Sequence, residues 1–494
     1  MNNFIKKIQE LKNKNKKIGM VHGVFDVVHA GHITHFTEAK KKVDYLIASV
    51  TSDKYVNKAP GKPIFSIQNR IKVLENLKLI DLVVESNSIN ALKNILLIKP
   101  NFYFKGAEYK DNKDVTNNIK LEKRYVQKFG GKIIFTGGQV YSSSKIINEK
   151  FNFFSEDVNN FIKKLNLKKF KENLFNFKEI NKKILIIGDP IIDIYKMVES
   201  TGKSNKASII SSQYINEKSF GGGTILIANF LSKFCKNVSV LYSSNKQNNK
   251  IINKFLDSRI NKVHFKSKVN FVKKIRFIEH YSKTKLFQNT LNENKRLDEF
   301  EVNKLRKFLI NKIKNYDKIF IFDFGYYSFP KQLIDIINLN PKKFIINCQS
   351  NSYNFGYNIP TKFSNGSIIC MDEIEYRLCV QDKNLPINDL IKKNLNKFSK
   401  FDQLIITRGK FGCHIVQNKK IYFVPSFFNE LKDSTGCGDI FLAAYGLSHI
   451  TNNFNLEECA TISHIAAGIH GSYFGNNNMV DYKSLIKVSD NILK

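Results

Sequence analysis

The segment of residues 21–32, VHGVFDVVHAGH, constrains the fold of this chain more than any other stretch. An apolar run at residues 18–21 leads into it and predicts a buried β-strand. The segment ends in His29 and His32, and residues three apart at the start of a helix lie on one face. The helix N-terminus beneath them offers unpaired N–H groups and the positive end of the helix dipole. The stretch therefore predicts a strand, a turn and a phosphate-binding helix.

Strands and helices alternate around this segment, from residue 17 to about residue 150. Strands are predicted at 18–21, 45–50, 82–84, 102–104 and 132–135, and helices at 33–41, 69–77, 89–98 and 120–129. Alternation of this kind gives a parallel sheet with helices on both faces. Ligands of such folds sit at the carboxyl ends of the strands, where the two histidines are expected.

The string GVFDVVHAGH resembles the signature of the nucleotidyltransferase (cytidylyltransferase) superfamily, in which an HxGH box follows the first strand. The resemblance implies that a phosphate oxygen of an acceptor attacks the α-phosphorus of ATP or CTP, and that pyrophosphate leaves. It assigns charge stabilisation to His29, His32 and Lys58, with Mg²⁺ as the metal ion. The residues implied on the nucleotide side are Gly23, Phe25, Asp26, Arg70, Lys105, Gly106, Glu108, Ser142, Ser143 and Ser144.

Structural roles are the alternative for several of these residues. The histidines and the serine run also suit helix caps, because hydroxyl and imidazole groups satisfy N–H groups at helix starts. Lys58 and Arg70 also suit a solvated surface in a chain with 79 lysines and arginines.

A second set of motifs begins after residue 183. The strand-like run ILIIGDPIIDIY carries Asp189 and Asp193, and a glycine run with Gly221 and Gly222 follows. Far downstream stands DSTGCGD, residues 433–439. Its glycines and the helix predicted at 440–447 form a pocket of N–H groups for a transferring phosphoryl group, beside Asp439 as the base.

This set, in this order, resembles the ribokinase-like (PfkB) carbohydrate kinases, with Cys437 in place of the usual alanine. The resemblance implies that Asp439 is catalytic and that Asp372 and Glu375 contact Mg²⁺ indirectly. It places Thr407, Gly409, Gly412, Asp433, Thr435, Gly436 and Gly438 on the nucleotide, and Asp189, Asp193, Gly221, Gly222 and Asn229 on the sugar.

Three features depart from the family pattern. Asp372 replaces an asparagine, Asn229 stands late in the glycine box, and Tyr326 and Tyr327 follow a strand end where smaller groups are usual. An active kinase and a degenerate domain kept for dimerisation or ligand sensing are therefore both open.

Together the two motif sets resemble the bifunctional heptose-phosphate kinase/heptose-1-phosphate adenylyltransferases, with the order reversed. The resemblance implies phosphorylation of a sugar or sugar phosphate, then nucleotidyl transfer to a sugar 1-phosphate for surface polysaccharide. Heptose and another sugar, polyol or acid phosphate stay open as acceptors, as do ATP and CTP. The rival is a cytidylyltransferase whose kinase domain serves only as a scaffold or sensor.

The expected organisation is a Rossmann-like nucleotidyltransferase domain at residues 1–150, a helical linker at 151–182 and a ribokinase-like domain at 183–494. Both domains are α/β folds with a doubly wound parallel sheet. The partners implied are a nucleoside triphosphate and a phosphorylated sugar or polyol, and a homodimer is one possible assembly.

Composition sets limits on other functions. The net charge of +36 comes from lysines spread along the whole chain without a nucleic-acid motif, so we expect no nucleic-acid partner. No apolar run approaches membrane-spanning length, and the lysine-rich start lacks the apolar core of a secretory signal. Seven scattered cysteines without a CxxC pair favour a reducing compartment, so we expect a cytoplasmic protein.

Overall fold

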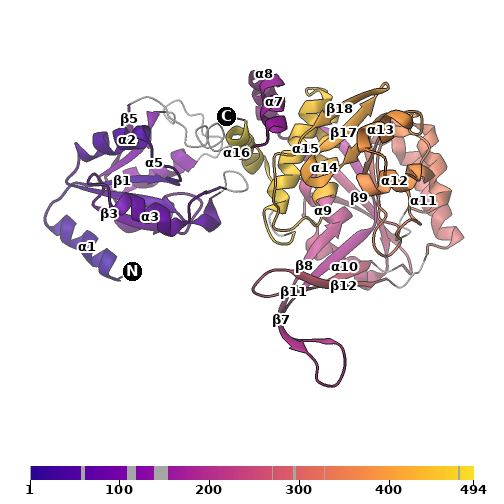
Figure 1. The fold of residues 1–494 in the computed structure, drawn as a ribbon, viewed down its shortest axis with the longest axis horizontal. Coiled ribbons are helices and arrows are strands. Elements are labelled where there is room, and N and C mark those ends of the chain that lie inside the picture. The colour runs from indigo at the N-terminus through magenta and orange to yellow at the C-terminus, as the bar shows by residue number, and fades with distance from the viewer. Residues whose placement is uncertain are drawn as a thin grey trace. The chain divides into compact units, whose positions relative to one another are not determined.

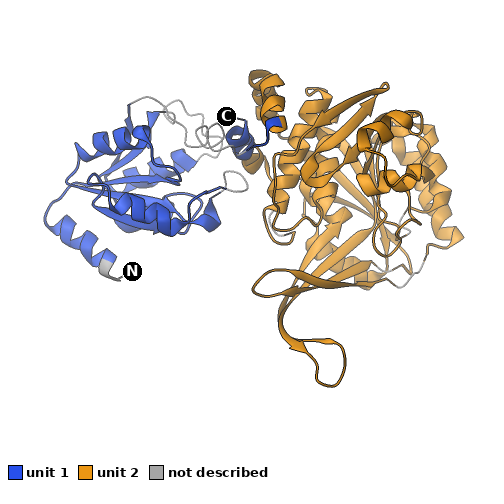
Figure 2. Ribbon diagram, viewed as in Figure 1, with its two compact units in different colours: residues 1–156, 486–494 blue, residues 157–485 orange. Residues whose placement is uncertain are grey.

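A computed structural model describes residues 2–56, 62–107, 118–137, 154–269, 271–292, 296–326, 329–476 and 479–493. The chain forms two compact units (Figure 2). Unit 1 contains residues 1–156 and 486–494, and unit 2 contains residues 157–485. No helix in the described ranges is both long and apolar enough to cross a membrane.

Unit 1 is built on a parallel sheet with the strand order β3-β2-β1-β4-β5. Its strands are β1 (Ile18–Gly23), β2 (Tyr45–Thr51), β3 (Leu82–Ser86), β4 (Phe102–Gly106) and β5 (Lys132–Thr136). Its helices are α1 (Asn2–Asn13), α2 (Ala30–Lys40), α3 (Ile67–Glu75), α4 (Leu92–Ile98) and α5 (Asn118–Lys128). The parallel sheet that the alternating pattern predicted is confirmed.

Alternate residues of β1 and β4 face two separate cores in this unit. Val21 and Phe104 pack with Phe36 of α2 and Leu74 of α3 on one face of the sheet. Residues of the other face, Met20 and Tyr103, pack with Ile8 of α1, Ile95 of α4 and Val126 of α5. The connections change face between β3 and β4, so the carboxyl ends of β1 and β4 form the topological switch point where ligands bind in such folds.

Unit 2 begins with α7 (Glu156–Lys164) and α8 (Leu167–Phe175), which lie within the stretch expected to be a helical linker. A nine-stranded sheet follows, in the order β10-β9-β6-β13-β14-β15-β16-β17-β18. Its strands are parallel from β10 to β16, and β17 and β18 form an antiparallel end. The bounds are β6 (Ile180–Gly188), β9 (Cys235–Ser244), β10 (Asn261–Lys266), β13 (Lys318–Asp323), β14 (Phe344–Cys348), β15 (Gly366–Asp372), β16 (Phe401–Thr407), β17 (Cys413–Gln417) and β18 (Lys420–Val424).

Helices cover both faces of this large sheet (Figure 1). They are α9 (Thr224–Leu231), α10 (Lys246–Phe255), α11 (Glu299–Lys312), α12 (Glu373–Val380), α13 (Ile387–Lys393), α14 (Cys437–Ile450) and α15 (Leu456–Gly471). The last helix, α16 (Tyr482–Ile492), begins in unit 2 and belongs to unit 1 from Ile486 on. Short 3₁₀ segments are found at Asp53–Tyr55, Ile313–Asn315, Lys331–Leu339, Pro341–Lys343, Pro360–Lys362 and Gly409–Phe411.

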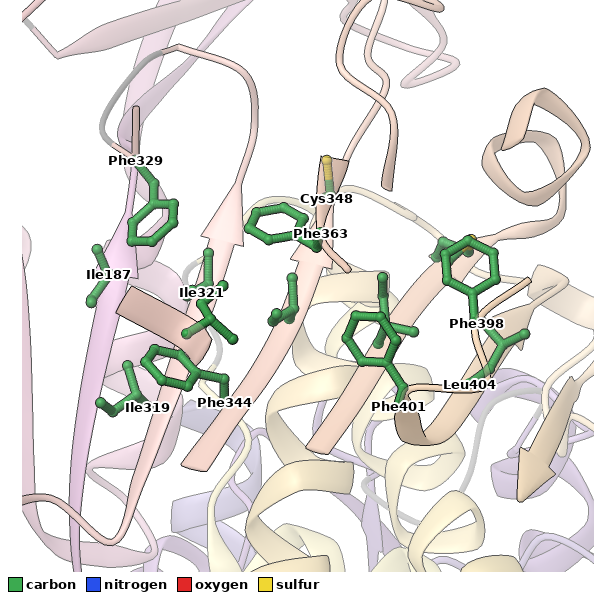
Figure 3. Packing of buried hydrophobic residues seen from close by; sticks show 14 of the residues in the cluster. Ile187, Ile319, Ile321, Phe329, Phe344, Cys348, Phe363, Phe398, Phe401 and Leu404 are labelled. Atoms are coloured by element: carbon green, nitrogen blue, oxygen red, sulfur yellow. The ribbon is translucent and has the colours of Figure 1, made fainter. Parts of the chain in front are cut away.

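The central strands of the large sheet are apolar on both sides because both faces are buried. Ile319 and Ile321 of β13 contribute to a large core with Phe344 and residues of α11, α12 and α13 (Figure 3). Phe320, between them, faces α14. Gly446 of α14 lies so close that a Cβ there would come within 2.5 Å of the Phe320 ring. This close packing fixes α14, and with it the loop before that helix, on the sheet.

A second, small sheet in unit 2 has the order β12-β11-β7-β8. The strands β7 (Pro190–Lys203) and β8 (Ile210–Gly223) form a long antiparallel hairpin whose far end extends away from the rest of the unit (Figure 1). Strand β11 (Val272–Glu279) runs parallel to β7, and β12 (Lys285–Leu291) pairs with β11. We call these four strands the small sheet.

Candidate active sites

The two histidines of the HxGH box meet at the carboxyl end of β1. His29 precedes the first turn of α2 in an extended conformation, and its backbone N–H donates to Nδ1 of His32 over 3.4 Å. The two rings stack with their centroids 4.0 Å apart, and Phe25 packs edge-on against His32 at 5.5 Å. Two imidazole rings side by side at a helix start suit a phosphate-binding site. Their catalytic role stays a prediction.

Phe25 shapes the turn before the histidines. Its φ of 51° lies in the left-handed region, which turns the chain sharply out of β1. A Cβ on Gly23 would lie 3.0 Å from the Phe25 ring, so the glycine allows the ring to fold back over the strand end. Both residues therefore act on the site through the backbone.

Asp26 and Arg70, predicted on the nucleotide side, fix the chain around the site. The Asp26 carboxylate is buried and accepts the backbone N–H groups of Ile64 (2.9 Å) and Phe65 (3.0 Å). Arg70 is 1% exposed. Its guanidinium donates to the carbonyl oxygens of Val24, Thr51 and Phe65 and to the carboxylate of Asp53. Both side chains thus shape the loops and also line a pocket beside Phe25, and their contact with the nucleotide stays a prediction.

Lys105 and Gly106 end β4 beside β1, as predicted, but the lysine has a partner within unit 1. Its Nζ lies 3.2 Å from a carboxylate oxygen of the buried Glu122 in α5, and 5.0 Å from the centre of the Tyr103 ring. Nucleotide contact by Lys105 stays a prediction. Lys58, Glu108, Ser142, Ser143 and Ser144 lie outside the described residues.

Two further histidines near this strand end were missed by the sequence analysis. Burial and the nearby charge of Lys105 lower the pKa of His22 to about 3 and that of His35 to about 4. His22 bonds to the hydroxyl of Ser49 (2.9 Å), and His35 to that of Thr136 (2.5 Å). Both rings are therefore neutral at physiological pH.

In unit 2 a cavity of 360 Å³ lies at the carboxyl ends of β14, β15 and β16, under the small sheet. The predicted residues that line it are Asp193, Gly222, Asp372, Glu375, Thr407, Thr435, Gly436, Gly438 and Asp439. Residues separated by nearly 250 positions thus meet in one space, at the edge where parallel sheets bind ligands.

Asp439 lies in the first turn of α14 at the wall of this cavity and is 6% exposed. Burial raises its pKa to about 7, with the nearby Asp193 acting in the same direction, while Lys274 and a hydrogen bond from Gln349 oppose the shift. The Gln349 amide donates to Oδ1 over 2.7 Å. A carboxylate with a pKa near neutrality suits a general base.

The loop before α14 is held by Asp433, which was predicted to contact the nucleotide. Its buried carboxylate accepts four hydrogen bonds: from Lys285 Nζ (2.6 Å), Tyr195 hydroxyl (2.7 Å), Thr435 N–H (3.0 Å) and Gly475 N–H (3.1 Å). It does not line the cavity described above. Asp433 thus anchors the loop, and its contact with the nucleotide stays a prediction. Gly436 takes a left-handed conformation with φ of 78° to start the helix.

Two cationic side chains from β11 line the cavity near Asp193. Arg276 of β11 forms an ion pair with Asp193, and Asn476 donates to the other oxygen of Asp193 over 3.4 Å. Lys274, two residues along β11, lines the same cavity, and burial lowers its pKa. Gly222 is required here, since a Cβ would lie 2.1 Å from the Asp193 carboxylate.

Asp189 and Asn229, predicted on the sugar, bond to the backbone of nearby loops. One Asp189 oxygen accepts the N–H groups of Phe324 (3.1 Å) and Tyr326 (3.3 Å), which holds the loop after β13. The Asn229 amide donates to the carbonyl of Phe255 (2.8 Å), and its oxygen accepts from the N–H of Asp257 (2.9 Å). Neither residue is among those that line the cavity, and their contact with the sugar stays a prediction. Gly221 also lies outside the lining, and a Cβ there would meet Ile225 at 2.5 Å.

Asp372 and Glu375 form a capping box at the start of α12. Each carboxylate accepts the backbone N–H of the other residue, and Glu375 also accepts from the N–H of Ser350 (2.8 Å). Burial and the adjacent Asp372 raise the pKa of Glu375 to about 8. Asp372 also lines the cavity, and one of its carboxylate oxygens accepts the N–H group of the cap. This arrangement fits a water-mediated contact with Mg²⁺. No cluster of metal-binding side chains occurs among the residues that the structure describes.

Residues 407–412 were predicted on the nucleotide side, and only part of this segment lines the cavity. Thr407 ends β16 and lines the cavity. Gly409 and Gly412 bound a 3₁₀ turn outside the lining, and a Cβ on Gly412 would lie 2.3 Å from the carbonyl of Val424. Their contribution is the shape of the turn.

Sequence reasoning missed Lys274, Arg276, Gln349 and Asn476, all of which line the cavity. The signal available for the first two was their spacing, since residues two apart on a strand point to the same face. In a chain with 79 lysines and arginines, such a spacing of two basic residues occurs often and does not mark a site. Gln349 and Asn476 stand in loops without a motif, and only the fold brings them to the site.

Two families match the chain. Residues 20–218 match the family described as cytidylyltransferase-like, and residues 181–481 match the pfkB family of carbohydrate kinases. The matches overlap at 181–218, where the structure places β6, β7 and β8 of unit 2. The nucleotidyltransferase-like region therefore precedes the kinase region, as predicted.

Relatives among characterised proteins include the bifunctional protein HldE of Blochmanniella floridana, which is 35% identical over 143 residues. That match covers 28% of this chain and 29% of the relative. The bifunctional protein HldE of Pseudomonas fluorescens is 32% identical over 145 residues, with 29% of each chain covered. The chain thus spans less than a third of the length of these relatives.

Among solved structures, unit 2 is similar to phosphofructokinase-2 from Escherichia coli in complex with fructose-6-phosphate. The two share 13% identity and a TM-score of 0.50, over 64% of this chain and 100% of the other. At this identity the likeness shows the fold alone, and it confirms a ribokinase-like architecture.

Proposed function

This chain belongs to the pfkB family of carbohydrate kinases, and on that premise we propose that unit 2 phosphorylates a sugar phosphate with ATP. We further propose that unit 1 transfers a nucleotidyl group from ATP or CTP to a sugar 1-phosphate. The observation that carries the proposal is the cavity of unit 2. It is lined by a carboxylate with a pKa of about 7, a glycine loop at a helix start and two cationic side chains.

The phosphoryl step uses Asp439 as the base. Its carboxylate takes the proton of the acceptor hydroxyl, whose oxygen forms a bond to the γ-phosphorus of ATP while the bond to ADP breaks. The N–H groups of the loop at Gly436 and Gly438 face the cavity and receive the charge of the transferring group. Gln349 holds the carboxylate in place through its 2.7 Å hydrogen bond. Mg²⁺, when bound near Asp372, neutralises phosphate charge.

A phosphorylated acceptor is favoured by the cations on β11. Asp193 is already engaged by Arg276, so it is less available to hydroxyl groups of a neutral sugar. Burial lowers the pKa of Lys274, so an anionic group on the acceptor would favour its ammonium form and compensate for the loss of hydration. We therefore assign the acceptor phosphate to Lys274 and Arg276.

The nucleotidyl step takes place at the switch point of unit 1. The phosphate oxygen of the sugar 1-phosphate attacks the α-phosphorus, and pyrophosphate leaves. His29 and His32, stacked at the start of α2, stabilise the charge that develops on the phosphates. The product is a nucleoside-diphosphate sugar, which we assign to surface polysaccharide synthesis. All seven cysteines are free thiols, which supports a cytoplasmic location.

The test supplies the purified full chain with ATP, Mg²⁺ and paired acceptors, each sugar with and without a terminal phosphate. Mass spectrometry of the products and a pyrophosphate assay with ATP or CTP follow both steps. We expect only phosphorylated acceptors to gain a second phosphate, and Asp439→Asn to remove that gain. If no acceptor is phosphorylated while a ready-made sugar 1-phosphate still yields pyrophosphate, unit 2 is a scaffold and the kinase proposal is wrong.

A further inference from the structure

Lys285 connects the small sheet to the loop that starts α14. It is the first residue of β12, and its Nζ donates to the Asp433 carboxylate (2.6 Å) and to the Thr435 hydroxyl (2.7 Å). No sequence motif includes this lysine, which stands about 150 positions before the loop. Its side chain is 36% exposed, whereas that of Asp433 is 3% exposed.

The charge of Asp433 depends on this contact. Burial alone would raise the pKa of Asp433, but hydrogen bonds from Lys285, Tyr195 and Thr435 hold it at about 2. The carboxylate is therefore ionised at neutral pH, and Lys285 is the only cation hydrogen-bonded to it in the described part of the chain. A buried carboxylate without a cationic partner is strongly unfavourable.

The loop also has backbone contacts: the Asp433 N–H donates to the Gly471 carbonyl (3.1 Å) and the Cys437 N–H to the Ser434 carbonyl (3.2 Å). Thr435 and Gly436 line the cavity, and Gly436 is left-handed and starts the helix. Besides the contacts to Asp433 and Lys285, the loop carbonyl of Thr435 accepts from His470 (3.0 Å). Because a glycine-rich loop has many competing conformations, the ion pair selects the one whose N–H groups face the cavity.

We propose that Lys285 is a positioning residue: its ammonium holds the loop of residues 433–436 in the conformation that receives the transferring phosphoryl group. The inference rests on the proposed kinase function for its catalytic meaning. Strand β12 pairs with β11, which carries Lys274 and Arg276. The small sheet therefore supplies the two cations that we assign to the acceptor phosphate. It also supplies the lysine that holds the loop of residues 433–436 in place.

The test compares Lys285→Met, which keeps most of the side-chain length but removes the charge, with Lys196→Met on the same sheet. Lys196 has a looser ion pair, 3.8 Å from Glu217, and a similar exposure of 32%. Amide hydrogen exchange is followed in a peptide spanning residues 432–441 of the full chain. We expect exchange in Lys285→Met to rise by about 10-fold or more, the scale of a lost charged hydrogen bond, and Lys196→Met to match the parent. Lys285→Gln repeats the test if the methionine variant folds poorly.

A small cation provides the second arm. Ammonium chloride should slow the exchange of Lys285→Met, because NH₄⁺ fits beside Asp433, whereas tetramethylammonium chloride at equal concentration should not. An unchanged loop in Lys285→Met, or a loosened loop that ammonium does not tighten, overturns the proposal. This readout needs no turnover, so it stands apart from failure of the kinase function.

Where an acceptor is found, kinetics add a further check. Lys285→Met should lower kcat by about 100-fold, the scale of a lost transition-state contact, while the KM for the acceptor changes little. Ammonium should restore part of kcat. A loss confined to KM would contradict a role in the phosphate loop and assign Lys285 to acceptor binding instead.

Discussion

Asp433, in the loop before α14, and Asp439, in the first turn of that helix, stand six positions apart, yet their surroundings shift their pKa values in opposite directions. Asp439 is buried without a cation in hydrogen-bond contact in the described structure, so its pKa rises to about 7. Asp433 is held at about 2 by Lys285 and three other donors. Identical side chains thus become a proton acceptor and a fixed anion.

Opposite stability effects should follow from these two pKa values. The folded state holds a proton on Asp439 that the unfolded state loses above pH 3.8, so stability falls as pH rises from about 4 to 7. At pH 8, Asp439→Asn should therefore raise the unfolding free energy by roughly 2–4 kcal/mol, and the melting temperature with it. Near pH 4 the melting temperature should stay unchanged. Asp433→Asn should lower it at pH 8, with the loss fading below pH 3.8. Thermal melts of both variants across pH check this, and shifts of equal sign would contradict it.

The rate of phosphorylation should depend on the same proton. Because a base must be unprotonated, kcat/KM should rise with pH up to about 7 and then level off. Gln349→Leu removes the amide that favours the charged form, so its profile should move to higher pH. Initial rates between pH 5 and 9 measure both profiles, and a profile that does not move in Gln349→Leu would argue against this contact.

The histidine pair gives a prediction for unit 1. His29→Ala with His32→Ala should reduce pyrophosphate release by about 100-fold or more, because charge on the phosphates loses its stabilisation. The melting temperature should stay near that of the parent, since both rings are only partly buried. His264→Ala, in unit 2, serves as the control. Retained turnover in the double variant would overturn the assignment.

At the scale of elements, buried polar side chains fix the loops that leave the strands. Arg70 on α3 ties together the turn after β1, the end of β2 and the entry to its own helix. Asp189, at the end of β6, does the same for the loop after β13. Such loops cannot join the sheet's hydrogen bonds, so their carbonyl and N–H groups need side-chain partners.

Removing one such side chain should loosen its loop. Arg70→Met leaves the Asp53 carboxylate and three carbonyl oxygens without their donor, so unit 1 should lose about 3–5 kcal/mol of unfolding free energy. Urea denaturation followed by circular dichroism measures the loss. Arg124→Met, on the exposed side of α5, should change stability by less than about 0.5 kcal/mol. Similar losses in both variants would contradict the role of Arg70.

At the scale of the molecule, each unit has its own sheet and its own cores. The two proposed activities should therefore be separable in the full chain. Asp439→Asn should stop phosphorylation and leave pyrophosphate release from a supplied sugar 1-phosphate intact. The histidine double variant should do the reverse. Each assay on both variants tests this, and loss of both activities in either variant would show that the sites depend on each other.

The sequence determined the fold class and the order of the two regions. Strand and helix periods differ and can be read locally, and the HxGH and DSTGCGD strings place glycines and polar groups at strand ends. These local signals predicted site roles for His29, His32 and Asp439, and those roles stay predictions. They did the same for Asp26, Arg70, Asp189 and Asn229, whose side chains bond to the backbone of nearby loops.

Only the tertiary structure decided what surrounds those groups. Lys274 and Lys285 reach the site because β11 pairs with β7 of the hairpin before α9, far away in sequence, and β12 pairs with β11. Burial and charge then set which carboxylate accepts a proton and which stays ionised. Local pattern carries no information about these distances, because a side chain's partners depend on how the sheets close over one another.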